Sequence, residues 1–319
     1  MKSDRRKILV IGSLNVDCVV HVEHTPVTGE TILCGDMSTI PGGKGANQAC
    51  AAGKLGADVI LLGAVGKDAH AQLQRESLSK AGVDISHLIE REDHDTGLAF
   101  ISIDNNGDNS IVVIQGANAT LTKEDIDDNL DLIRQSDIIL FQLEIPIDTV
   151  VYGARRAKEL GKMVILDPAP VPRDFPEELY EYVDIVKPNE TELSMLTRTP
   201  DVEYHMEEAV SCLKGKGVKH VVVTLGENGV YLDSEETGRK RIPAIPVHAV
   251  DTTAAGDSFT AALAVMLAEG KNMEEAVSFA IRVSSVVVTR KGAQSSIPTL
   301  EEVQELMGRK EKLPGGMSE

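Results

Sequence analysis

Residues 251–259 read DTTAAGDSF and precede a run of good helix formers, so we expect a helix to begin among the small residues. Unpaired backbone N–H groups point outward at a helix N-terminus, and the short side chains of Ala254, Ala255 and Gly256 would let a phosphate approach them. The helix dipole favours an ionised Asp257, which can accept the proton of an alcohol that attacks phosphorus. The segment predicts phosphoryl transfer; helix capping by Asp257 is the alternative.

A second glycine-rich turn, PGGKGANQA at residues 41–49, leads into a helix of small residues. It is not a Walker A motif, because Lys44 is not followed by Ser or Thr, and Gln48 stands where GxGxxG needs its last glycine. What remains is a tight turn that presents the Lys44 ammonium and the Asn47 amide, which suit hydroxyls or a phosphate. A turn without a ligand is the alternative interpretation.

Polar residues also follow two apolar strands. Asn15 and Asp17 lie on the same side of an extended segment after the strand expected at residues 8–11. An amide and a carboxylate there could clamp two sugar hydroxyls, whereas an Asx turn is the competing explanation. Glu144 follows the strand expected at residues 138–141, where open α/β sheets bind ligands.

Two later segments have the pattern of a nucleotide site. In PNETE, residues 188–192, Asn189 and Glu192 could hold magnesium through water, and helix capping explains the same pair equally well. In TLGENG, residues 224–229, a strand ends in a glycine turn that could lie against a nucleotide or simply connect two strands of a hairpin.

These residues must be positioned by an α/β framework. We expect strands at residues 8–11, 59–62, 138–141, 164–166, 185–186 and 218–225. We expect helices at residues 45–55, 69–81, 123–134, 148–160, 190–196, 207–216, 257–269 and 274–288. The alternation predicts a mainly parallel sheet covered by helices on both faces.

Two stretches depart from that alternation. Residues 16–40 and 98–115 show strand patterns without a helix, and NNGD at residues 105–108 is a hairpin turn candidate. We interpret them as a small antiparallel sheet that covers a ligand; a decorative edge hairpin is the alternative. A single domain is expected over residues 1–309, with a flexible tail at residues 310–319.

The composition excludes several function classes. The 319 residues carry a net charge of −18, no Trp and 3% aromatics, which argues against nucleic acid and anionic membranes as partners. The four cysteines form no CxxC pair and the eight histidines no HExxH spacing, so we expect no zinc site. Without a signal-peptide pattern or a bilayer-length apolar run, we expect a soluble, cytoplasmic protein.

The order of the motifs narrows the class. GSLNVD at residues 12–17, PGGKGANQA, PNETE, TLGENG, DTTAAGDSF and TRKGAQSS at residues 289–296 closely resemble the ribokinase family of carbohydrate kinases, also called the PfkB family. The resemblance extends from Ile8 to about Pro298. It implies a three-layer α/β/α sandwich with a mainly parallel central sheet and a β lid, which closes over the sugar and often pairs with the lid of a second subunit in a homodimer.

The resemblance also implies an activity and residue roles. ATP would phosphorylate the 5-hydroxyl of D-ribose, with Mg²⁺ and a monovalent activator such as K⁺, Asp257 as general base, and an anion hole at Ala254, Ala255 and Gly256. The implied sugar-binding residues are Asn15, Asp17, Gly42, Gly43, Lys44, Asn47, Glu144 and Asp257. The implied ATP-binding residues are Asn189, Glu192, Thr224, Leu225, Gly226, Glu227, Asn228, Gly229, Gly256 and Asp257. The implied positions of the monovalent cation site are Asp251, Thr253, Val287, Arg290, Gly292 and Ser296.

Departures from the family pattern leave alternatives open. Ala254 replaces the first glycine of the frequent DTxGAGD, and Ile281 stands where many relatives place His or Asn against the nucleotide. A kinase for 2-deoxyribose, a nucleoside or another sugar would share the anion hole. A catalytically silent sugar or nucleotide sensor is the alternative from another class, and the presence of Asp257 argues against it, since binding alone needs no base.

Overall fold

The computed structural model describes residues 6–106 and 108–310, the last five as backbone only. Within these ranges eight strands form a central sheet in the order β14-β13-β12-β11-β10-β9-β1-β4. Their bounds are β1 Lys7–Ile11, β4 Asp58–Leu62, β9 Ile138–Phe141, β10 Met163–Leu166, β11 Ile185–Val186, β12 His220–Thr224, β13 Val230–Ser234 and β14 Gly238–Ile242. From β4 to β12 neighbouring strands are parallel, and β13 and β14 extend the edge in antiparallel pairing.

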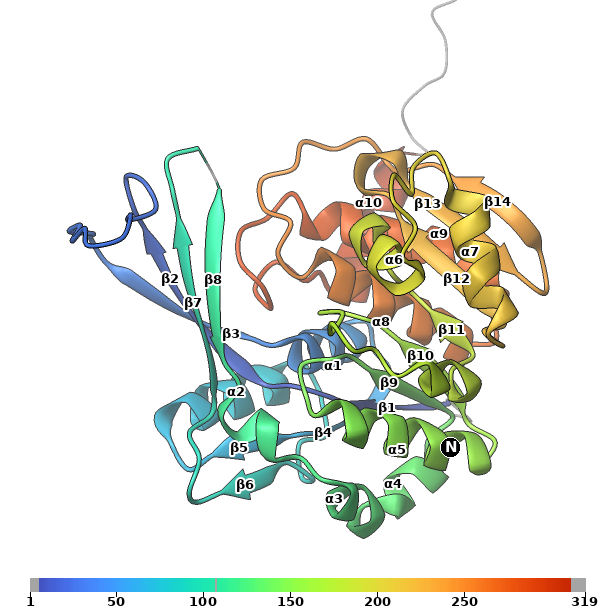
Figure 1. The fold of residues 1–319 in the computed structure, drawn as a ribbon, viewed down its shortest axis with the longest axis horizontal. Coiled ribbons are helices and arrows are strands. Elements are labelled where there is room, and N and C mark those ends of the chain that lie inside the picture. The colour runs from blue at the N-terminus through green and yellow to red at the C-terminus, as the bar shows by residue number, and fades with distance from the viewer. Residues whose placement is uncertain (1–5, 107, 311–319) are drawn as a thin grey trace, which may run out of the picture.

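Each inner strand serves two hydrophobic cores, one on either face of the sheet. In β1, Ile8 and Val10 pack into one core, and Leu9 and Ile11 pack into the other. The first core lies under α1 Lys44–Lys54, α2 Ala69–Lys80, α8 Ala255–Ala268, α9 Met273–Val287 and α10 Leu300–Lys310. The second lies under α3 Lys123–Asp128, α4 Leu130–Gln135, α5 Ile147–Glu159, α6 Glu190–Thr197 and α7 Met206–Gly215 (Figure 1). Burial on both faces explains why the parallel strands are continuous apolar runs.

A second sheet, here called the lid sheet, projects away from the central sheet (Figure 1). It has the order β3-β2-β7-β8, with β2 Asn15–His21, β3 Met37–Gly42, β7 Gly97–Ile103 and β8 Asn109–Ile114. The expectation of a purely antiparallel sheet is wrong, because β2 and β7 pair in parallel. Asn15 and Gly97 pair at its base, so both strands run outward from the body. The β7–β8 hairpin is present, and Gly107 of its expected turn lies outside the described residues.

The prediction of one continuous helix at residues 123–134 is wrong. The structure divides it into α3 and α4 at Asn129, whose φ of −109° and ψ of 20° leave the helical region. The Asn129 side chain donates to the Asp125 carbonyl at 2.9 Å, a local hydrogen bond that competes with the helical ladder. The predicted α/β class, with a mainly parallel central sheet and a smaller sheet, is confirmed. The tail expected at residues 310–319 lies outside the described residues apart from Lys310.

The expected elements miss the sheet edge formed by β13 and β14, helix α10, and the short strands β5 Ala64–Gly66 and β6 Ile89–Arg91. The first edge strand follows the glycine turn at residues 224–229, which therefore does connect a hairpin. Across the part of the chain that the structure describes, every helix is too short or too polar to cross a lipid bilayer.

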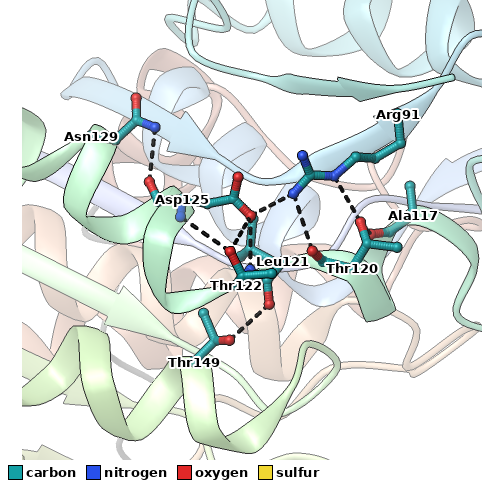
Figure 2. A network of polar contacts seen from close by, with 8 residues as sticks. All are labelled: Arg91, Ala117, Thr120, Leu121, Thr122, Asp125, Asn129 and Thr149. Atoms are coloured by element: carbon teal, nitrogen blue, oxygen red, sulfur yellow. Dashed lines mark hydrogen bonds and ion pairs between the residues drawn. The ribbon is translucent and has the colours of Figure 1, made fainter.

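A network of polar contacts holds the segment that follows β8 of the lid sheet (Figure 2). Arg91 donates to the hydroxyl of Thr120 at 2.9 Å and to its carbonyl at 3.1 Å, and it also pairs with Asp125. These contacts hold the short 3₁₀ helix Gly116–Thr120 against α3. Asn118, within that 3₁₀ helix, is thereby held beside the residues that follow β1.

Candidate active site

Asp257 lies in the first turn of α8 with 6% of its surface exposed. Asn47 donates to one carboxylate oxygen at 2.9 Å and Gln48 to the other at 3.3 Å, and both bonds favour the ionised form. Burial nevertheless raises the pKa of Asp257, against the opposing effect of Lys44. A raised pKa makes this carboxylate a stronger proton acceptor at neutral pH than an exposed aspartate.

The helix start offers fewer free amides than the three expected. Ala254 is the N-cap in a left-handed conformation, with φ 60° and ψ 8°. The Ala255 N–H donates to the Thr252 carbonyl at 3.2 Å, so it is already occupied. The N–H groups of Gly256 and Asp257 have no acceptor within the helix, since they belong to its first turn. The amides left free for an anion at this helix start are therefore those of Gly256 and Asp257.

Glu144 joins three segments of the expected sugar site. Its Oε2 accepts from the Ser13 hydroxyl at 2.6 Å, from the backbone N–H of Lys44 at 3.1 Å and from the Asn15 amide at 3.4 Å. These donors come from the end of β1, the start of α1 and the start of β2. The carboxylate thus ties the sugar-site candidates together at the carboxyl ends of β1 and β9.

Asn15 and Asp17 lie at the base of the lid sheet. Asn118 donates to the Asn15 side-chain oxygen at 2.8 Å, which orients the amide. Asp17 lies in β2 close to Gly42, where an added Cβ would be 2.3 Å from its Oδ2. Burial, and then the nearby Glu144, raise the pKa of Asp17 to about 7. The pair expected from sequence is held in a strand rather than in an Asx turn.

Lys44 reaches from the start of α1 into the same region. Burial alone would lower the pKa of its ammonium, but Asp257, Asp167 and other surrounding carboxylates outweigh burial and raise it. The lysine is therefore held in its charged form between the sugar-site residues and the neighbouring cleft. Gly43, with φ 88°, makes this close approach possible, because a Cβ there would lie 2.5 Å from the Asn15 nitrogen.

A cleft of about 830 Å³ adjoins Asp257, large enough for a nucleotide. The expected ATP-binding residues that line it are Asn189, Glu192, Thr224, Gly226, Glu227, Asn228, Gly229, Gly256 and Asp257. Leu225 does not line it, because its side chain is 3% exposed and packs in the hydrophobic core. Ile281 and Val247 give the cleft an apolar part that suits a base.

Asn189 and Glu192 form a capping box and also line the cleft. Each side chain accepts from the other residue's backbone N–H at 2.8 Å, so the capping alternative is realised. Burial, followed by the charge of Asp167, raises the pKa of Glu192. Among the described residues no group of three or more His, Cys, Asp or Glu side chains could hold a metal ion. A magnesium ion here would fit only with phosphate and water as most of its ligands.

The two loops of the expected monovalent cation site lie side by side. Asp251 accepts from the Gly292 N–H at 2.8 Å and from the Thr253 N–H at 2.9 Å. Burial alone would raise the pKa of Asp251, but these hydrogen bonds outweigh burial and lower it. Arg290 pairs with Glu302 at 2.9 Å, so its guanidinium is engaged elsewhere. Of the remaining candidates, Val287 is the last residue of α9, and the Ser296 hydroxyl donates to the Ala293 carbonyl at 2.7 Å.

Sequence reasoning missed two buried charged residues beside Asp257. Asp167, 1% exposed, accepts from Gln48 at 3.0 Å and from Thr260 at 3.2 Å. Lys187, 4% exposed, places its Nζ 3.1 Å from Asp167 Oδ1. Both residues directly follow parallel strands, β10 and β11, which is the criterion that identified Glu144. The same criterion, applied to every parallel strand, would have identified Asp167 and Lys187.

A buried carboxylate at a helix start, beside a cluster of polar side chains and a nucleotide-sized cleft, is the arrangement expected of a kinase that phosphorylates a hydroxyl group. The profile of the pfkB family carbohydrate kinases matches residues 5–300. The chain belongs to this family of carbohydrate kinases.

Relatives and solved structures agree with that assignment. The chain is similar to the ribokinase of Haemophilus influenzae, with 38% identity over 95% of this chain and 99% of the relative. It is 35% identical to the deoxyribokinase of Salmonella typhimurium, over 95% of this chain and 99% of the relative. The structure of Arabidopsis thaliana ribokinase complexed with ribose and ATP superposes with a TM-score of 0.89 and 38% identity, covering 95% of this chain and 99% of that one.

Proposed function

We propose that the protein is a ribokinase that uses ATP to phosphorylate D-ribose at its 5-hydroxyl. The observation that carries the proposal is the position of Asp257, whose neighbour Asn47 belongs to the sugar-site candidates and which itself lines the cleft. The 5-oxygen would form a bond to the γ-phosphorus as the bond to the β,γ-bridging oxygen breaks and its electrons go to ADP. The hydroxyl proton would pass to Asp257, and the Gly256 N–H would stabilise the phosphoryl charge.

The sugar would lie under the base of the lid sheet. The Asn15 amide and the Asp17 carboxylate would bind its hydroxyl groups there, beside the backbone of Gly42 and Gly43. Glu144 supports this arrangement, because it fixes Asn15 and the start of α1 relative to each other. Lys44 would contribute its charge between the sugar and the phosphate.

The proposal includes a divalent ion. The carboxylates of Asp167, Glu192 and Asp257 around the cleft repel a nucleotide triphosphate, and the net charge of −18 adds to that repulsion. Magnesium bound to the phosphates would offset it, with Glu192 reaching the ion through water.

A monovalent ion is also proposed, between the loops that Asp251 and Gly292 join. Backbone carbonyls from these loops would surround it. By holding the loop before α8 in place, the ion would order the anion hole.

A coupled assay that measures ADP release, with Mg²⁺ and K⁺ present, tests the proposal on a panel of sugars. D-ribose should give a kcat/KM at least about tenfold above that of the next sugar. The Salmonella relative makes 2-deoxy-D-ribose the specific competitor in this panel. A preference for 2-deoxy-D-ribose would replace the proposal with a deoxyribokinase, and the absence of turnover with every sugar would favour a sensor.

We also propose that two copies pair through their lid sheets, in agreement with the expected homodimer. Ile111 in β8 is 53% exposed and pairs with Ile101, on the same face as Asp17. An exposed apolar sheet favours association with a second sheet, and β8 exposes apolar side chains on both faces, among them Ile111 on one and Val112 on the other. We assign the pairing to the face that carries Asp17, so Ile111→Lys should convert a dimer into a monomer in light scattering. Val112→Lys is the comparison variant, since Val112 is 64% exposed on the opposite face and should leave the dimer intact. A wild-type monomer at micromolar concentration would refute the pairing.

A further inference from the structure

A second lysine besides Lys44 lies at the anion hole. The Lys187 side chain enters from the end of β11, is 4% exposed and lines the cleft. A Cβ placed on Gly256 would lie 3.3 Å from its Nζ, so the ammonium lies against the first turn of α8. The sequence analysis gave this residue no role.

The ammonium of Lys187 forms an ion pair with Asp167 but no hydrogen bond to it. The separation from Asp167 Oδ1 is 3.1 Å, yet that oxygen has no hydrogen-bond partner, so the contact is an ion pair without hydrogen-bond alignment. Asp167 directs its other oxygen to Gln48 and Thr260. An ammonium has three N–H donors, and in the described part of the chain none of those of Lys187 is hydrogen-bonded to protein. Donors are thus available to an anion in the cleft.

We propose that Lys187 binds the terminal phosphate of ATP at the Gly256 turn, and that Asp167 is the residue that positions it. The inference rests on the proposed kinase function and adds a cation to its anion hole. The phosphoryl group would lie between the Gly256 N–H and the Lys187 ammonium, which would stabilise the charge that develops on its oxygens during transfer.

Asp167 is suited to a positioning role. It is buried at 1% exposure and takes hydrogen bonds from α1 and α8, so its carboxylate is fixed relative to Asp257. A carboxylate this deeply buried needs a cation beside it, and Lys187 provides one. Burial and the charge of Asp167 raise the pKa of Asp257, and the Lys187 ammonium, together with Lys44, acts in the opposite direction.

The first test measures nucleotide affinity calorimetrically with Mg²⁺ and two probes, ADP and AMP-PCP, an ATP analogue with a methylene between the β- and γ-phosphorus. Lys187→Met should weaken AMP-PCP binding by about tenfold or more and ADP binding by less than threefold, because only the analogue carries the terminal phosphate. Lys187→Arg should keep most of the affinity. An unchanged ratio of the two affinities in Lys187→Met would overturn the inference.

The second test separates a role in binding and catalysis from a role in folding. Lys187→Met leaves Asp167 buried without its cation and should lower the Tm, whereas Asp167→Asn with Lys187→Met should restore it. The double variant should still show a kcat at least about a hundredfold below wild type, as for loss of a group that binds the transferring phosphoryl. Recovery of kcat together with the Tm would overturn the inference.

Lys158→Met serves as the matched control, because Lys158 pairs with the buried Asp184 at 2.7 Å away from the cleft. This variant should leave both nucleotide affinities and kcat within twofold of wild type. The nucleotide titrations do not depend on the sugar. If wild type fails to phosphorylate ribose, the proposed function fails, and the AMP-PCP to ADP ratio still decides the role of Lys187.

Discussion

The contact between Gly42 and Asp17 gives a prediction whose magnitude can be worked from distances. A Cβ at position 42 would lie 2.3 Å from Asp17 Oδ2 and within 2.7 Å of Cγ and Oδ1. Ordinary van der Waals contact begins near 3.4 Å, so Gly42→Ala must displace the carboxylate by about 1 Å. Gly42 has no positive φ, so alanine adds no backbone strain, and the effect falls on Asp17.

A displacement of about 1 Å at a substrate-positioning group lowers the rate by about a hundredfold, or about 2.7 kcal/mol of transition-state stabilisation. We expect kcat/KM for ribose to fall by about that factor while the KM for ATP changes little, since Asp17 is not among the residues that line the nucleotide cleft. Gly215→Ala is the control, because its added Cβ meets nothing within 4 Å. A kcat/KM within threefold of wild type, with unchanged circular dichroism, would refute the assignment of Asp17.

Three further outcomes are expected. Burial, then Glu144 and Asp257, raise the pKa of Asp17 from 3.8 to about 7. Between these values the folded chain keeps a proton that the unfolded chain releases. The free energy of unfolding should therefore decrease as the pH rises from about 4 to 7. Asparagine cannot ionise, so the Tm of Asp17→Asn should exceed that of wild type by an amount that increases from about pH 4 to pH 7 and stays constant above about pH 7. A difference in Tm that does not change with pH would contradict the raised pKa of Asp17. If the ionised carboxylate binds the sugar, the KM for ribose should rise as pH falls from 8 to 6 in wild type only. Replacing K⁺ with tetramethylammonium should lower kcat severalfold at unchanged Tm, and equal rates in both salts would discard the site near Asp251.

The pattern of apolar runs predicted the central sheet well, because burial on both faces forces runs such as residues 8–11 to be apolar without interruption. The edge strand β14 was missed because it reads GRKRI and is largely exposed, so it carries no apolar signal. Its neighbour β13 reads VYLDS and is buried throughout, but its apolar run is only three residues long. The break at Asn129 was also missed, because it depends on a side-chain hydrogen bond that no periodicity reveals.

The candidate site was partly predictable for a similar reason. Asn15, Asp17 and Glu144 follow strands, and their position along the chain is enough to place them at one sheet edge. The occupied N–H of Ala255 and the positive φ of Ala254 could not be predicted, since they depend on how the loop at Thr252 folds back on the helix start. The pairing of Asp167 with Lys187 depends on β10 and β11 being neighbours, which is a property of the sheet order.

The most direct test of the proton acceptor is turnover by Asp257→Asn, measured beside ribose affinity from calorimetry. Asparagine keeps the volume of the side chain, and its oxygen can still accept from Gln48. Its NH2 group can donate to Asn47, whose Oδ1 has no hydrogen-bond partner, once the Asn47 amide turns over, so the site should stay folded. We predict ribose binding within about threefold of wild type and a kcat lower by about a thousandfold or more. Turnover within tenfold of wild type would contradict the central claim that this carboxylate takes the proton from the sugar hydroxyl.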